Sequence, residues 1–162
     1  MNASFERLFD TLAKDDFKFL HKFIDGPQQQ ELLLRKGVYP YDYVDGPAKL
    51  EETQLLPKQE FYSKLYEEGI RDEDYQHAKN VWTTFNCQTL EDYQKIYLRS
   101  DVLLLTDVFE SFQKMTLATY KLDPAHYFTP PDLCYDAMLK LTGVKLQLVD
   151  DPDMYLMVES GN

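Results

Sequence analysis

The feature that most constrains this chain is an apolar arc within residues 89–120, its longest stretch of helical periodicity. On a wheel of about 3.6 residues per turn, neighbouring side chains of this stretch fill one continuous face. The face consists of Tyr97, Leu98, Asp101, Val102, Leu104, Leu105, Val108, Phe109 and Phe112. Thr89 and Asp92 have the spacing of a capping box, which begins a helix. The pattern therefore predicts one long helix whose arc faces a core.

One member of the arc, Asp101, is a carboxylate near the middle of a predicted core face. A buried carboxylate without a partner is unfavourable by several kcal/mol unless hydrogen bonds, a cation or a metal compensate it. Tyr97 lies one turn earlier on the same face. Two interpretations follow. Asp101 forms a buried ion pair or caps a neighbouring helix, or it binds a catalytic metal while Tyr97 orients the attacking water.

Composition limits the classes of function. The chain has 162 residues, 44% of them hydrophobic, which suits one domain with a real core. No apolar run reaches the roughly 18 residues of a membrane span, and no signal-peptide pattern begins the sequence. Two cysteines and three scattered histidines support neither a disulfide framework nor a zinc site, so we expect a reducing, intracellular location. The net charge of −11 predicts weak independent binding to DNA.

The remaining pattern predicts a mostly α chain with one or two short strands. Irregular structure is expected for residues 36–57, where glycines and prolines interrupt the periodicity. Helices are predicted at 4–24, with a break near residue 15, and at 57–69, 72–85, 89–120, 129–143 and 152–159. Alternating side chains predict a strand at 144–149.

Two further positions are candidates for phosphate binding. Lys36 precedes Gly37 at the mouth of the irregular loop, where its ammonium group can approach a phosphate or simply remain solvated at a helix end. Ser4, followed by Phe5, is either an ordinary N-cap or a hydroxyl that binds a phosphate at a helix N-terminus. The nearby tyrosines of residues 39–43 can stack on bases or pack beneath the loop.

Taken in order, these motifs resemble the 3′–5′ exonuclease domain of protein-primed family B DNA polymerases. The matching motifs are Ser4-Phe5-x-x-Leu8, Lys36-x-x-Tyr39 and Tyr97-x-x-x-Asp101. Longer phrases are similar to the polymerases of polinton (Maverick) elements and related viruses. They include residues 33–41, 61–63, 77–82, 101–110, 120–127 and 148–154, so the resemblance covers essentially the whole chain.

The resemblance implies a partial ribonuclease H-like exonuclease domain in residues 1–120 and a connection toward the polymerase palm in residues 121–162. It implies that Asp101 binds a catalytic Mg²⁺ or Mn²⁺, that Tyr97 orients the water and that Lys36 assists at the scissile phosphate. Ser4 would help to hold the primer end. Phe5 stands where the family usually has Leu.

The family's other exonuclease carboxylates and its palm motifs are absent from the sequence. We therefore expect a fragment that is inactive in isolation. Its parent would be a DNA-directed DNA polymerase of a transposable element or virus, acting in the nucleus or at a viral replication site with a DNA primer 3′ end and a terminal protein, and without a membrane.

Two alternatives remain. One is a truncated, non-catalytic helical module that serves as a protein-interaction or structural domain. The other is a self-contained metal nuclease that uses Asp101 with Asp107 or Glu110, although both of these point away from Asp101 on the helical wheel.

Overall fold

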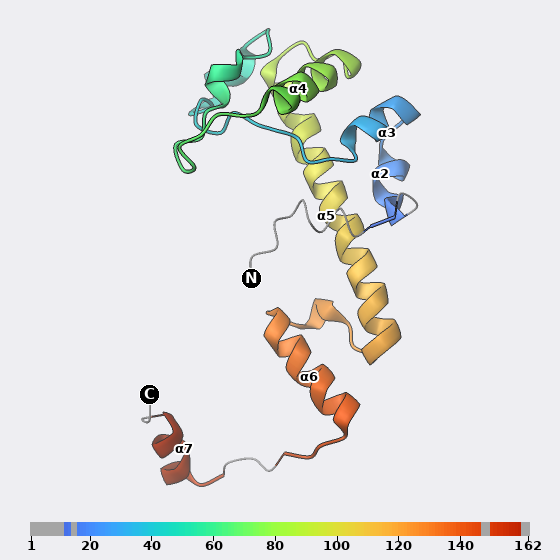
Figure 1. The fold of residues 1–162 in the computed structure, drawn as a ribbon, viewed down its shortest axis with the longest axis vertical. Coiled ribbons are helices and arrows are strands. Elements are labelled where there is room, and N and C mark those ends of the chain that lie inside the picture. Colours follow the sequence, from blue (N-terminus) through green and yellow to red (C-terminus); the bar gives the residue numbers. More distant parts are fainter. Residues whose placement is uncertain (1–11, 14–15, 147–149, 160–162) are drawn as a thin grey trace. The chain divides into compact units, whose positions relative to one another are not determined.

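The computed structural model describes residues 12–13, 16–146 and 150–159, which are mostly helical (Figure 1). In chain order, the elements are α2 (Lys18–Phe23), α3 (Pro27–Leu33), the 3₁₀ helices η2 (Pro47–Glu51) and η3 (Lys58–Phe61), α4 (Asp72–Thr84), α5 (Leu90–Tyr120), the 3₁₀ helix η4 (Pro124–His126), α6 (Pro130–Thr142) and α7 (Pro152–Glu159). The chain divides into two compact units, Met1–Ser111 and Phe112–Asn162, and α5 runs from the first into the second. None of the helices in the described ranges is long and apolar enough to cross a membrane.

The predicted ribonuclease H-like fold is wrong for this chain. Such a fold requires a central sheet, whereas the described residues form no strand and contain one isolated antiparallel bridge, between Ser63 and Glu68. Of the strand predicted at 144–149, residues 144–146 are irregular and 147–149 lie outside the described residues. A strand is stable only when its N–H and C=O groups pair with a neighbouring strand, and no neighbouring strand is present in the described residues.

The helix boundaries that depend on local capping are confirmed. Thr89 and Asp92 exchange the two hydrogen bonds of a capping box, with N···O distances of 3.2 and 3.4 Å, and α5 begins at Leu90, immediately after Thr89. Thr129 starts α6 in the same way, and Gly143 ends it with a φ of 67°. The helix predicted at 57–69 is wrong beyond η3, where the chain becomes extended at Tyr62.

The core of the first unit is built on α5. Figure 1 shows α2, α3 and α4 grouped around the N-terminal half of this helix. One cluster joins α2 and α3 to α5 through Phe17, Leu20, Ile24, Leu33, Leu103 and Leu104. A second joins α4 and the preceding loop to the start of α5 through Leu56, Phe61, Ala78, Val81, Cys87, Leu90 and Tyr93. The first turns of α5 are therefore fixed on two sides.

The buried face of α5 differs from the predicted arc. A stripe with alternating spacings of three and four residues is buried, and we call it the buried stripe: Leu90, Tyr93, Tyr97, Ser100, Leu104 and Asp107. A second stripe with the same type of spacing, the exposed stripe, is 42–63% exposed: Leu98, Val102, Leu105 and Phe109. The predicted arc combined members of both stripes, so it is correct for Tyr97 and Leu104 and wrong for the exposed stripe.

Asp107 is the fully buried carboxylate of this helix. It is 1% exposed, and its two oxygens accept hydrogen bonds from the backbone N–H groups of Phe19 (2.8 Å) and Leu20 (3.0 Å). These donors lie in the first turn of α2, where backbone N–H groups have no partner within the helix. The helix-capping role that the pattern allowed for Asp101 therefore belongs to Asp107.

The second unit consists of the end of α5, η4, α6 and α7. Gln113 donates a hydrogen bond to Asp123 (2.9 Å), which also accepts one from the backbone N–H of Ala125, so the turn after α5 is fixed. Leu133 and Ala137 of α6 are buried. Both residues, together with the buried Thr116, line an apolar groove between the end of α5 and α6.

Candidate functional site

Tyr97 lies at the centre of a cluster of tyrosines. Its side chain is buried on α5, and its hydroxyl is 2.7 Å from the hydroxyl of Tyr41. The Tyr39 ring stacks on the Tyr97 ring at 5.2 Å between centroids, and the Tyr41 ring meets it edge-on at 6.1 Å. Burial raises the pKa of Tyr97, and the Tyr41 hydrogen bond and the Asp101 charge raise it further. Tyr97 is therefore a protonated hydrogen-bond donor at neutral pH.

Asp101 follows Tyr97 by one helical turn and is only partly exposed. Its Oδ1 atom is buried and has no hydrogen-bond partner in the described part of the chain. The ion pairs of the described residues include those of three other carboxylates, Asp72, Asp74 and Glu91. A buried carboxylate oxygen without a donor is unfavourable, so Asp101 has unused capacity to bind a cation or a hydrogen-bond donor.

The loop that carries Lys36 lies directly against Tyr97. A Cβ atom placed on Gly37 would be 3.1 Å from Cδ2 of Tyr97, a separation that leaves no room for a side chain without movement. One residue later, the carbonyl of Val38 accepts a hydrogen bond from the hydroxyl of Tyr93, at 2.7 Å. The loop is therefore attached to the buried stripe of α5, and Lys36, which is exposed, is the residue immediately before Gly37.

Three of the five predicted site residues lie in two segments that contact each other: Lys36 is in the loop whose Gly37 lies against Tyr97, and Asp101 is one turn after Tyr97 on α5. The other two, Ser4 and Phe5, lie outside the described residues.

The sequence interpretation did not identify Tyr41 as a partner of Tyr97. Tyr41 is 68% exposed, yet its hydroxyl bonds to the buried Tyr97, so its ring connects the interior to the surface. The Tyr39 ring meets the Tyr41 ring edge-on, and its buried hydroxyl has no partner within the described part of the chain; burial raises the pKa of Tyr39. The available signal was the alternation of tyrosines at 39, 41 and 43. Tyr43 takes a separate role, because its hydroxyl donates to Glu52 and Lys49 lies over its ring.

Metal binding requires more ligands than this cluster supplies. Two-metal phosphodiester hydrolysis uses several carboxylates around the ions. Among the described residues, no group of three or more His, Cys, Asp or Glu side chains is arranged to hold a metal ion. Asp101 can supply one ligand to a metal site, and the other ligands would have to come from outside the residues described.

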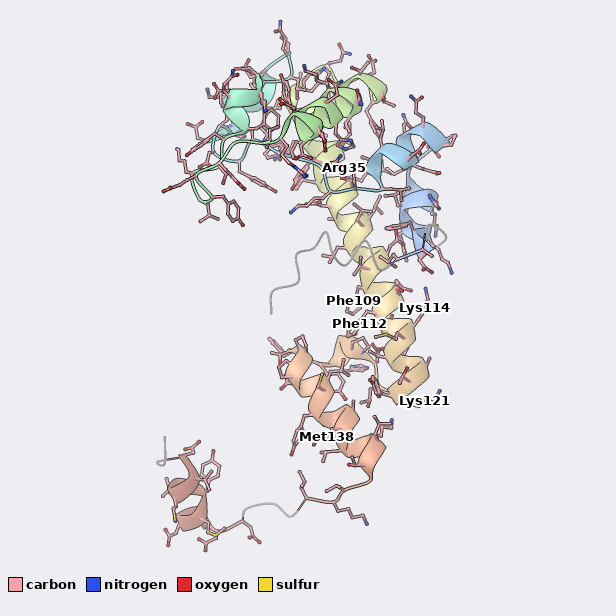
Figure 2. The ribbon with its side chains drawn as sticks, in the orientation of Figure 1. Arg35, Phe109, Phe112, Lys114, Lys121 and Met138 are labelled. Carbon is pink, nitrogen blue, oxygen red and sulfur yellow. The ribbon has the colours of Figure 1, made fainter. Side chains whose placement is uncertain are left out.

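A separate polar groove of about 560 Å³ lies between α3 and α4, and Figure 2 labels Arg35 beside it. The Arg35 guanidinium forms an ion pair with Asp74, to which Arg71 also donates at 2.9 Å. Burial alone would raise the pKa of Asp74, but the hydrogen bonds from Arg71 and Arg35 outweigh it and hold the pKa below its ordinary value. Because its guanidinium is already neutralised, this groove is a poor anion site, and the tyrosine cluster is the better candidate.

Comparison of the chain with protein-family models, with curated proteins and with solved structures gives no match in any of the three.

Proposed function

We propose that this chain is a piece of a protein-primed family B DNA polymerase and contributes Tyr97, Asp101 and Lys36 to a metal-dependent 3′–5′ exonuclease. In this role it acts on the 3′ end of a DNA primer during replication, in a protein encoded by a transposable element or virus. The terminal protein would be a partner of the complete polymerase, at its replication site in the nucleus or virus-infected cell.

One observation carries the proposal. Two motifs that are far apart in the sequence, at residues 36–39 and 97–101, contact each other through Gly37, Tyr39 and Tyr97. Asp101, one turn after Tyr97, has a buried oxygen with no partner among the residues that the structure describes. The juxtaposition supports a shared chemical task.

The chemistry assigned to each residue follows from its environment. The Asp101 oxygen would hold one face of a Mg²⁺ or Mn²⁺ ion, which would supply a metal-activated water as the nucleophile. The protonated Tyr97 hydroxyl would donate a hydrogen bond that orients this water, and the exposed Lys36 ammonium would neutralise charge at the scissile phosphate. Since Asp101 alone cannot hold two ions, we expect this chain by itself to show only background nuclease activity.

The proposal can be tested by photocross-linking at the cluster. An oligonucleotide that carries 4-thiothymidine at its 3′ end is irradiated with the chain in low salt and Mn²⁺, and the labelled peptide is identified by mass spectrometry. We expect adducts within residues 36–41, reduced at least fivefold by Lys36→Ala. The matched control carries the same base at its 5′ end. Equal labelling from both ends, or none within residues 36–41, would contradict the proposal.

A second candidate function is a non-catalytic helical module that binds another protein. The exposed stripe of α5 favours it, because four large apolar side chains in a row along one helix face are typical of an interaction surface. Binding of Mn²⁺ distinguishes the two functions. If Asp101→Asn weakens the paramagnetic broadening that Mn²⁺ causes at resonances around residues 97–101, the result supports the exonuclease function. If the broadening is unchanged, the result supports the protein-interaction function.

A further inference from the structure

The second unit contains an apolar groove that no part of the described chain fills. Its volume is about 530 Å³, within the range of about 300–1,000 Å³ that is usual for binding sites. The groove is lined from α5 by Phe112, Met115, Thr116 and Tyr120, and from α6 by Pro130, Leu133, Cys134, Ala137, Met138, Leu141 and Thr142. Figure 2 labels Phe112 on α5 and Met138 on α6.

The second unit also contains an apolar helix, α7, none of whose residues is buried. In α7, consecutive side chains from Met154 to Val158 are 54–77% exposed. Met154 and Val158 are four residues apart and therefore share one face of the helix. The hydroxyl of Tyr155 bonds instead to Glu159, at 2.8 Å, on another face. The Met154–Val158 face is thus available to pack into an apolar groove.

The charges around the two surfaces are complementary. Residues 150–159 contain Asp150, Asp151, Asp153 and Glu159 and no basic residue. The ammonium groups of Lys121 and Lys140 lie at the end of the groove where α5 stops, because they donate hydrogen bonds to the carbonyls of Ala118 and Lys121. Figure 2 labels Lys121 at the end of α5.

The short connection between α6 and α7 favours α7 of the same chain as the segment that fills the groove. Residues 143–151 join the two helices and can span at most roughly 30 Å when extended. This connection leaves α6 at Thr142, which lines the same end of the groove that Lys121 and Lys140 flank. An α7 that returns antiparallel to α6 would place its acidic first turn at these lysines. A short connection also gives α7 a millimolar effective concentration at the groove, well above that of a second copy in dilute solution.

We propose that α7 docks into the groove between α5 and α6 of its own chain, with Met154 and Val158 in the groove and the acidic first turn near Lys121 and Lys140. The proposal is independent of the exonuclease function, since it uses only the second unit.

Cys134 provides a direct measurement, because it is exposed and lines the groove. The other cysteine, Cys87, is buried, and burial raises its pKa to about 11, so it reacts slowly with thiol reagents. In the full chain, we expect maleimide to label Cys134 at least tenfold faster after the double substitution Met154→Asp and Val158→Asp. The matched control is Leu65→Asp, which adds one charge at an exposed apolar position of the first unit and should leave the rate unchanged.

Disulfide trapping then identifies which copy supplies α7. After Val158→Cys and mild oxidation, we expect a disulfide with Cys134 within one chain, seen as a monomer on a non-reducing gel and confirmed by peptide mapping. A cross-linked dimer would overturn the proposal in favour of exchange between two copies. Wild-type Cys134 that reacts as fast as in the double variant would overturn it as well, because α7 would then leave the groove uncovered.

Discussion

The buried and exposed stripes of α5 have the same spacing but opposite surroundings. Leu104 is fully buried beneath α2, whereas Leu105, the next residue, is 53% exposed. The buried stripe even includes Ser100 and Asp107, while the exposed stripe is entirely apolar. Burial on this helix is therefore decided by which neighbouring elements supply partners, and side-chain hydrophobicity alone is a poor guide to it.

The pair Leu104 and Leu105 tests this contrast most strongly. Leu104→Ala should lower the free energy of unfolding by about 2–5 kcal/mol, because it leaves a cavity in the cluster with Leu20 and Leu33. Leu105→Ala makes the same chemical change one residue later and should alter stability by less than about 0.5 kcal/mol. Urea denaturation followed by circular dichroism measures both. Similar losses would mean that the exposed stripe is covered in solution, and the contrast would fail.

Asp107 extends the comparison from apolar to polar groups. Asp107→Ala would leave the buried N–H groups of Phe19 and Leu20 without acceptors, and each should destabilise the fold by about 1–3 kcal/mol. We expect a total loss of roughly 2–6 kcal/mol, with faster amide exchange at α2. Asp132→Ala is a control for an exposed helix-start carboxylate, which should have a smaller effect of about 1 kcal/mol. Equal effects would remove the special role of Asp107.

Gly37 tests whether the loop is fixed against the buried stripe at Tyr97. Gly37→Ala introduces a Cβ atom 3.1 Å from the Tyr97 ring, which is buried and stacked and therefore cannot easily move. Overpacking of this kind should destabilise the chain by about 1 kcal/mol or more. Gly69→Ala is the matched control, because nothing lies within 4 Å of its added Cβ atom. A thermal melt of each variant measures the difference, and equal melting temperatures would show that the loop is not held at Tyr97.

His77 lies next to the buried stripe, where it lines a small cavity of about 10 Å³ with Gly37, Tyr97 and Ser100. Its titration should make the stability of the fold depend on pH. Burial, and then the nearby Arg35 charge, lower its pKa. Its contribution to stability is therefore complete above its unfolded pKa of about 6.5 and is lost as the pH falls toward its folded pKa. One proton gives a slope of at most about 1.4 kcal/mol per pH unit.

Melting curves between pH 5 and 8 should show this slope in the wild type and a flatter profile in His77→Gln. The carboxyl of Asp74 also has a lowered pKa, and its contribution is lost only at lower pH, below its unfolded pKa of about 3.9. An unchanged slope in His77→Gln would assign the pH dependence to other groups.

These contrasts also explain what could be predicted from the sequence. Capping boxes and glycine stops act locally, so the starts of α5 and α6 and the end of α6 were predictable from Thr89, Thr129 and Gly143. The buried face of α5 was not, because it depends on where α2 and α4 pack after the chain folds. The sheet was expected from a family resemblance, and no pairing of strands in the described residues supports it.

The candidate site likewise has features that could be predicted from the sequence and features that could not. The four-residue spacing places Tyr97 and Asp101 on one helix face, and this follows from helix geometry alone. The contact of Gly37 with Tyr97 and the hydrogen bond between Tyr41 and Tyr97 depend on a loop without periodicity, so the sequence contained no rule that fixes them.

Asp101 gives the smallest expected effect and the sharpest contrast with Asp107, six residues later on the same helix. Asp107 satisfies two buried donors, whereas the buried oxygen of Asp101 has no partner in the described residues. Asp101→Asn removes a poorly compensated charge and should leave the melting temperature unchanged or raise it by about 1–3 °C, which corresponds to a few tenths of a kcal/mol. Asp107→Asn, the identical change, should lower it, because the amide nitrogen cannot accept a hydrogen bond from Phe19 or Leu20. A drop in Asp101→Asn as large as that in Asp107→Asn would show that Asp101 stabilises the fold, and its candidacy as a metal ligand would lose its physical basis.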